Sequence, residues 1–166
     1  MTVQYETLKK AIDDEGASDV ALYGLVKAFA MAVEENGMKF GLCVAPETSI
    51  EEVCHVLDDL LEGSEPMIEF IDILAVKPGI GGQTFDRAAL KKLQYVRNRF
   101  PLLPFLGIDG GVSIADGTAK DALNSGANYL IAGSAIFTTS RDARDGDDIV
   151  AENISAFIDM VLGLAQ

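Results

Sequence analysis

Four short apolar segments, each of strand length, constrain the fold of this chain more than any other feature of the sequence. They lack the alternation of polar and apolar residues found in sheets with one face in water, which predicts strands covered on both faces. Stretches with helical spacing of apolar residues separate them, so strands and helices alternate. This order predicts an α/β fold with parallel strands and right-handed crossovers. The predicted strands are residues 40–44, 71–76, 105–108 and 129–132.

The helical spacing of apolar residues predicts five helices. The clearest covers residues 50–61 and follows Ser49, which forms a capping box with Glu52 three residues later, so that each side chain satisfies a backbone N–H of the first turn. Apolar stripes predict further core-facing helices over 22–33, 90–100 and 150–161, and an alanine-rich segment predicts one over 114–124. Residues 2–6 predict a fifth strand. Five strands and five helices are fewer than the eight units of a closed barrel, so the chain is short for its fold.

The composition and the net charge restrict the classes of function that the chain can have. With 166 residues, 49% of them hydrophobic, the chain has the material for a single domain over residues 1–166. A net charge of −13 argues against nucleic acid as the main partner, because an acidic surface repels phosphate backbones. No apolar run is long enough to span a membrane, and the first residues do not resemble a signal peptide, so we expect a cytoplasmic protein without a membrane partner. In a reducing compartment we expect Cys43 and Cys54 to be free thiols.

Glycine-rich loops follow three of the predicted strands, over residues 77–83, 109–112 and 133–136. Because the carboxyl ends of parallel strands form the functional face of such folds, we expect these loops to lie side by side. Glycines there allow a ligand to approach the backbone, whose N–H groups attract an anion of phosphate size. The alternative is that the glycines only make tight turns between strand and helix.

Three polar residues are candidates for chemical roles. Asp109 stands at a strand end, where a partly desolvated carboxylate serves as acid, base or metal ligand, or else caps the turn that follows. Lys77, also at a strand end, would pair with phosphate or with Asp109, or be an ordinary lysine at the rim. His55, the single histidine, lies on the helix after Ser49, far from the strand ends, which predicts a structural or surface role.

With these loops, the sequence resembles the ribulose-phosphate 3-epimerase family, TIM barrels of the pentose phosphate pathway. The resemblance rests on PGIGGQTF at 78–85, DGGV at 109–112 and GSAIF at 133–137, together with ENGMKFGL at 35–42, APET at 45–48 and SGAN at 125–128. It spans roughly residues 22–137. It implies a (β/α)8-barrel relative, here an incomplete barrel of about five βα units.

The resemblance also implies roles for individual residues. Asp109 resembles the aspartate that binds the divalent metal, whether zinc, iron, manganese or magnesium, and exchanges a proton at C3. The reaction implied is the interconversion of D-ribulose 5-phosphate and D-xylulose 5-phosphate. The loop that closes on the substrate is matched by Gly81, Gly82 and Gln83, and the phosphate cradle by Gly110, Gly111, Gly133 and Ser134.

The chain departs from the family in its first strands. The second catalytic aspartate and the additional metal-binding histidine of the family have no counterpart, and His55 is no substitute. We therefore expect weak metal binding and poor epimerisation from a truncated, partial or divergent family member, unless a homo-oligomer supplies the missing strands. Two alternatives stay open: a sugar-phosphate-binding or regulatory module without turnover, and a different phosphate-binding barrel enzyme.

Overall fold

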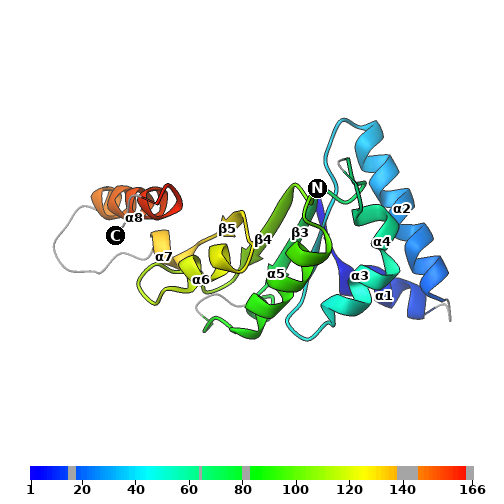
Figure 1. Ribbon diagram of the computed structural model, residues 1–166, viewed down its shortest axis with the longest axis horizontal. Helices are drawn as coiled ribbons and strands as arrows, with labels where there is room; N and C mark the ends of the chain where they lie inside the picture. The colour runs from blue at the N-terminus through cyan, green and yellow to red at the C-terminus, as the bar shows by residue number, and fades with distance from the viewer. Residues whose placement is uncertain (15–17, 64, 80–82, 138–145, 164–166) are drawn as a thin grey trace.

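The computed structural model describes residues 1–14, 18–63, 65–79, 83–137 and 146–163, and shows one parallel sheet with helices along it (Figure 1). The sheet has five strands in the order β1-β2-β3-β4-β5, so each strand pairs with its neighbours in the sequence. This is the order of successive βα units in a barrel, and the expected α/β fold is confirmed. The strands are β1 (Thr2–Gln4), β2 (Gly41–Val44), β3 (Phe70–Leu74), β4 (Phe105–Asp109) and β5 (Tyr129–Ile131).

The helices agree with the predicted stripes in position but less well in extent. The predicted helix over 50–61 is broken at Leu57, whose ψ of 17° ends one helix and starts the next. The alanine-rich helix begins only at Thr118, after Gly117 in the left-handed region. Tyr5 and Glu6, predicted as strand, instead begin a helix that buries Tyr5 and Leu8. The helices are α1 (Tyr5–Asp13), α2 (Asp19–Glu35), α3 (Ile50–Val56), α4 (Asp58–Leu61), α5 (Ala88–Arg99), α6 (Thr118–Asn124), α7 (Ser134–Phe137) and α8 (Gly146–Val161).

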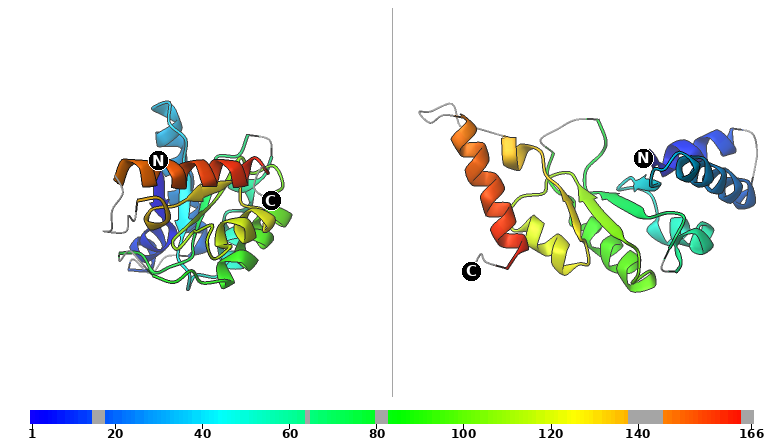
Figure 2. Two further views of the ribbon diagram at one scale, coloured as in Figure 1. Left: turned by 90° about the vertical axis from the view of Figure 1, so that its left-hand side faces the viewer. Right: turned by 90° about the horizontal axis from the view of Figure 1, so that it is seen from above.

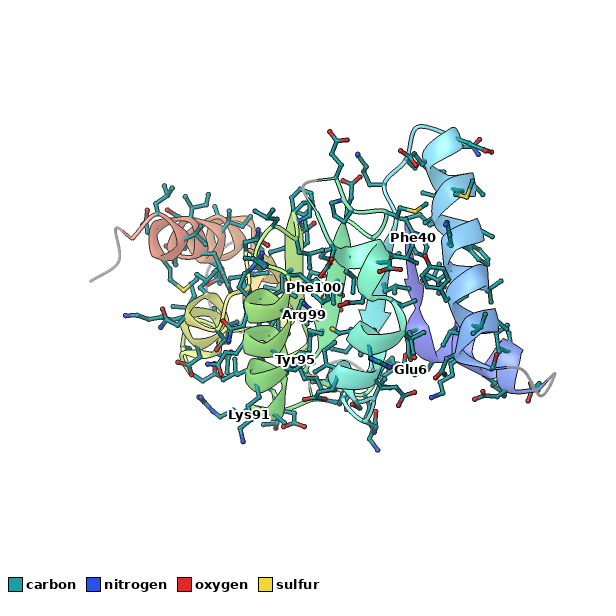
Figure 3. The ribbon with its side chains drawn as sticks, turned by 45° about the vertical axis from the view of Figure 1, so that its right-hand side comes forward. Glu6, Phe40, Lys91, Tyr95, Arg99 and Phe100 are labelled. Atoms are coloured by element: carbon teal, nitrogen blue, oxygen red, sulfur yellow. The ribbon has the colours of Figure 1, made fainter. Side chains whose placement is uncertain are left out.

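The core lies between the sheet and one layer of helices. Leu42, Ile71 and Ile108 are fully buried in this core. Helices α3, α5 and α6 lie along one side of the sheet (Figure 2). Figure 3 looks onto this layer, where Phe100 follows α5 and is buried in the core. Helices on one side of a sequentially ordered parallel sheet are what repeated right-handed crossovers produce.

The other face of the sheet is only partly covered. The strands lack alternating polar and apolar residues, and this pattern had predicted that both faces would be covered. Phe70 and Tyr129 stack edge to face there, with ring centroids 5.3 Å apart, yet Phe105 and Tyr129 remain 47% and 48% exposed. Within the described residues, the expectation that both faces are covered is therefore wrong for β4 and β5. A Cβ at Gly107 would lie 2.7 Å from the Phe70 ring, so only glycine admits that ring.

Helix α8 also departs from its predicted packing. Phe157 and Met160 are partly buried against the core, but Ile154 and Ile158 are 42% and 51% exposed. Val161 is 57% exposed as well, so less than half of the stripe predicted to face the core is covered within the part of the chain that the structure describes. The helix lies at the end of the molecule beyond β5 and α7 (Figure 1).

The predicted capping box of α3 forms only in part. Ser49 Oγ accepts a hydrogen bond from the Glu52 backbone N–H at 3.2 Å, as expected. The Glu52 carboxylate, however, forms an ion pair with Lys9 of α1 instead of reaching back to Ser49. Glu52 therefore joins α3 to α1. The Ser49 hydroxyl is the side-chain cap at the start of α3.

We expect Ser49→Ala to lower the free energy of unfolding by about 1 kcal/mol, because the Glu52 N–H loses its acceptor. Urea denaturation followed by circular dichroism measures this. Ser18→Ala is the matched control, since Ser18 precedes α2 without a side-chain capping bond to the described residues. Equal losses in the two variants would contradict a specific role for the Ser49 cap.

Candidate functional site

The three glycine-rich loops meet at the carboxyl ends of β3, β4 and β5, as predicted. They enclose two adjoining hollows that share the walls formed by Gln83, Gly111, Val112 and Ser134. The Asp109 hollow, about 400 Å³, is also lined by Leu74, Val76, Lys77, Pro78, Gly79, Asp109, Gly110, Ile131 and Gly133. The Arg87 hollow, about 500 Å³, is also lined by Thr84, Phe85, Arg87, Ser113, Asp116, Thr118 and Ala135. Two adjoining hollows at strand ends suit an elongated polar ligand.

Asp109 is the last residue of β4 and is half-buried in the Asp109 hollow. The parallel register places it beside Leu74 on β3 and Ile131 on β5, and its carbonyl accepts a hydrogen bond from the Ala75 N–H at 2.7 Å. The strand ladder therefore fixes the backbone that carries the carboxylate. A side chain at the end of a parallel strand is well placed to act on a ligand above the sheet.

Both glycines after Asp109 are required by the turn. Gly110 and Gly111 have φ angles of 100° and 68°, which other residues rarely adopt. A Cβ on Gly110 would lie 2.4 Å from Val76 Cγ2, and one on Gly111 would lie 2.9 Å from the Phe85 nitrogen. The turn-making role is thus real, and it brings the backbone of Gly110 and Gly111 to the wall of the Asp109 hollow.

The remaining predicted residues come from the other two loops. Ser134 begins α7 and lines both hollows, and Gly133 accepts hydrogen bonds from the N–H groups of Ile136 and Phe137. Gln83 Nε2 donates to the Lys77 carbonyl at 2.6 Å, which ties the two ends of the 77–83 loop together. Gly81 and Gly82 lie outside the described residues.

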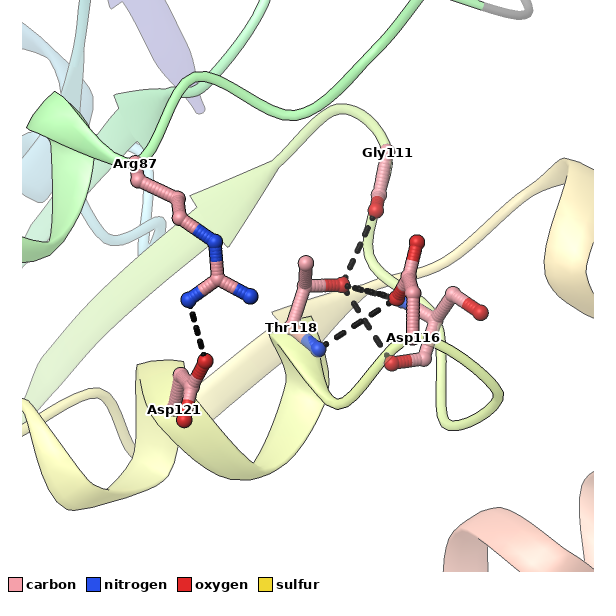
Figure 4. A network of polar contacts seen from close by, with 6 residues as sticks. Arg87, Gly111, Asp116, Thr118 and Asp121 are labelled. Carbon is pink, nitrogen blue, oxygen red and sulfur yellow. Dashed lines mark hydrogen bonds and ion pairs between the residues drawn. The ribbon is translucent and has the colours of Figure 1, made fainter.

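A polar network joins the loop after β4 to the start of α6 (Figure 4), and its residues line the Arg87 hollow. Thr118 Oγ1 lies 3.0 Å from the Gly111 carbonyl oxygen and accepts a hydrogen bond from the Ser113 N–H at 2.9 Å. Asp116 accepts from the Thr118 N–H; desolvation raises the pKa of Asp116, but the Thr118 hydrogen bonds outweigh it and leave that pKa below its usual range. The network therefore ties the loop after β4 to the first residue of α6.

The two cations near the loops are used differently. Lys77 pairs with Glu47 at 3.3 Å and not with Asp109, so its role at the rim is that of an exposed ion pair. Arg87, just before α5, was not singled out from the sequence. Its Nη1 lies 2.6 Å from Asp121 of α6 while the side chain lines the Arg87 hollow.

His55 is exposed on α3, which agrees with the predicted surface role. Cys43 and Cys54 are free thiols, as predicted.

Asp72 is a second residue that the sequence reasoning missed. It is 3% exposed on the same sheet face as Asp109, and its Oδ1 has no hydrogen-bond partner among the described residues. Burial, followed by the negative charge of Asp109, raises its pKa to about 7, while the Cys43 thiol 3.7 Å from Oδ2 lowers it slightly. The sequence did contain a sign of this residue, because Asp72 is the single charged residue within the otherwise apolar strand β3.

The expected metal site is not assembled by the described residues. No group of three or more His, Cys, Asp or Glu side chains among them has an arrangement that would hold a metal ion. Catalytic metal sites ordinarily use at least three protein ligands. Asp109 alone is therefore too small a donor set for a resident cation.

The fold and the loops together define a class: an α/β protein with the strand order of a barrel, whose strand ends carry glycine-rich loops and the Asp109 carboxylate. The family model described as the ribulose-phosphate 3 epimerase family matches residues 23–137. The chain belongs to this family. The resemblance found in the loop motifs is thus confirmed.

Individual relatives agree with the family assignment. The chain is 34% identical over 106 residues to the cytoplasmic isoform of ribulose-phosphate 3-epimerase of Oryza sativa subsp. japonica, which covers 64% of this chain and 43% of the relative. It is 36% identical over 108 residues to ribulose-phosphate 3-epimerase of Escherichia coli strain K12, covering 63% and 44%. The enzyme of Bacillus subtilis strain 168 is 33% identical over 114 residues, covering 65% and 47%. The matched region is less than half the length of each of these relatives.

In the described part of the chain, none of the helices combines the length and the apolar character needed to cross a bilayer.

Proposed function

We propose that this chain acts on a pentulose phosphate and transfers a proton at C3, in the interconversion of D-ribulose 5-phosphate and D-xylulose 5-phosphate. The observation that carries the proposal is the position of Asp109, half-buried at the end of β4 in a hollow walled by glycine-rich loops. Family membership supports the same reaction. The partner is then a small molecule, and neither nucleic acid nor a membrane, and we place the reaction in the cytoplasm.

The hydrogen at C3 of such a ketose is acidic because the neighbouring C2 carbonyl accepts the electron pair that it leaves behind. In the proposed step Asp109 takes this proton, the C3–H bond breaks, and an enediolate forms between C2 and C3. Return of the proton from Asp109 regenerates the same isomer, because it comes from the same face. Delivery of a proton to the opposite face gives the C3 epimer.

Inversion therefore needs a second acid facing Asp109. Asp72 does not serve, because it lies on the same sheet face, paired with Gly107 nearer the start of β4, and does not line the Asp109 hollow. We also propose Asp109 as one ligand of a divalent cation, although the described residues do not complete a site around it. Exchange of the C3 hydrogen with solvent is the step that Asp109 supports by itself.

We propose that the other predicted residues hold the substrate. The backbone of Gly110, Gly111, Gly133 and Ser134 would receive the phosphate, since N–H groups of such loops attract anions. Gln83, with Gly81 and Gly82, would close the loop over the sugar. The walls that Gly111, Ser134 and Gln83 contribute to both hollows support this arrangement.

Proton NMR of D-ribulose 5-phosphate in D₂O with the purified chain tests the proposal, with and without added Zn²⁺, Mn²⁺ or Mg²⁺. We expect the C3 proton signal to disappear as deuterium replaces it, at a rate above that without protein. Appearance of D-xylulose 5-phosphate reports inversion separately. Absence of both exchange and inversion with a folded chain would contradict the proposed function.

A further inference from the structure

We propose that Arg87 binds the phosphate group of the substrate and so selects for phosphorylated sugars. The inference rests on the proposed function and adds to it a side chain that the glycine-loop motifs do not contain. Arg87 directly precedes α5 and lines the hollow next to the one that holds Asp109. Gly111 and Ser134, both proposed to hold the phosphate, line the same hollow.

The position of Arg87 leaves most of its guanidinium available. Nη1 lies 2.6 Å from Asp121 of α6, which holds the side chain across the end of the hollow. In Figure 4 the other terminal nitrogen lies on the side of Thr118. A guanidinium has five N–H donors in a fork that matches two phosphate oxygens, and it keeps its charge at every physiological pH.

The charges around the hollow make Arg87 the suitable partner for an anion. The chain carries a net charge of −13, so an anionic ligand needs a local cation to offset the surrounding field. Lys77 lines the adjoining hollow and not this one. Asp116 is the opposing charge at this hollow, and its Oδ1 already accepts the Thr118 N–H. Arg87 is the one cationic side chain among the described residues that line the hollow.

The two hollows then separate the two ends of the substrate. The phosphate lies where the hollows adjoin, with Arg87 on one side and the backbone of Gly111 and Ser134, flanked by Gly110 and Gly133, on the other. The carbon chain extends from there toward Asp109. A sugar without phosphate reaches Asp109 but gains nothing from Arg87. Arg87 therefore acts in binding and discrimination and takes no part in proton transfer.

Binding of inorganic phosphate and of D-ribulose 5-phosphate, measured by ³¹P NMR titration of the full chain, tests this inference. We expect Arg87→Ala to weaken both by about tenfold or more, the loss typical of a hydrogen bond to a charged group. Arg87→Lys should recover part of the affinity, because the charge is kept and the fork is lost. Arg87 is 61% exposed, and circular dichroism verifies that each variant is folded.

Arg99→Ala is the matched control, since it removes the same charge from the other end of α5, where Arg99 pairs with Asp58 and Glu62 (Figure 3). We expect it to bind phosphate as the unmodified chain does. Unchanged binding in Arg87→Ala, or equal weakening in the two variants, would overturn the inference and leave the proposed function standing. A folded, unmodified chain that binds neither ligand would count against the proposed function itself, and the inference would fall with it.

Discussion

Replacing Asp109 with asparagine is expected to slow deuterium incorporation at C3 of D-ribulose 5-phosphate by about 10²- to 10⁴-fold. Asparagine keeps the size and the position at the end of β4 but cannot accept the C3 proton as a base. The same NMR experiment in D₂O measures the effect. Binding of inorganic phosphate should change little, because the Arg87 hollow does not include Asp109.

Asp59→Asn provides the comparison for Asp109→Asn. It removes one carboxylate from an exposed position on α4, away from both hollows. We expect its exchange rate to match that of the unmodified chain. If Asp109→Asn exchanges the C3 hydrogen as fast as Asp59→Asn does, another group removes the proton and the role assigned to Asp109 is wrong.

Replacing Asp72 with asparagine is expected to stabilise the chain at pH 8 by up to about 4 kcal/mol more than at pH 4. Burial raises the pKa of Asp72 to about 7, so the folded chain holds this proton more tightly than the unfolded chain, whose aspartates ionise near pH 4. The stability that the protonated group contributes is complete below pH 4. This contribution is lost as the pH rises from 4 toward 7, because ionisation of Asp72 in the folded chain leaves a charged carboxylate buried, whereas in the unfolded chain the same charge is in water.

Urea denaturation of both forms at pH 4, 6 and 8 measures the difference that Asp72 makes. Two other titratable groups face Asp72: Asp109 on β4 and Cys43 on β2, whose pKa burial raises to about 11, so that its thiol stays neutral over this range. The asparagine of the variant cannot titrate, and the remaining carboxylates are common to both forms. A stability difference that is constant from pH 4 to pH 8 would show that Asp72 does not titrate in the folded chain as expected.

The fold was largely predictable because its strands and helices have different apolar spacing. All five strands were located, and the order of elements indicated a parallel sheet. The predictions that were wrong concerned features that depend on tertiary contacts. The run 129–132 has the same composition whether or not a second layer covers Tyr129, and Leu57 breaks its helix although it continues the apolar stripe. Local spacing records which residues are apolar, but not how much of each is covered.

The arrangement of the loops at the candidate site was predictable where glycine restricts the backbone. Gly110 and Gly111 adopt conformations that demand glycine, and the strand order brings their loop next to Gly133 and Ser134, as expected. Arg87 and Asp72 were missed for a physical reason: neither belongs to a local motif. Arg87 acquires its position through Asp121, 34 residues away, and Asp72 becomes buried through the pairing of β3 with β2 and β4.

The sequential strand order also bears on how the sheet forms. Each ladder joins segments only one βα unit apart, as in the pairing of Cys43 with Asp72, 29 residues later. Closing these connections costs less chain entropy than pairing strands that are several units apart would cost. A growing chain can therefore add each new strand to an edge that already exists, so that assembly of the sheet can keep pace with synthesis from β1 to β5.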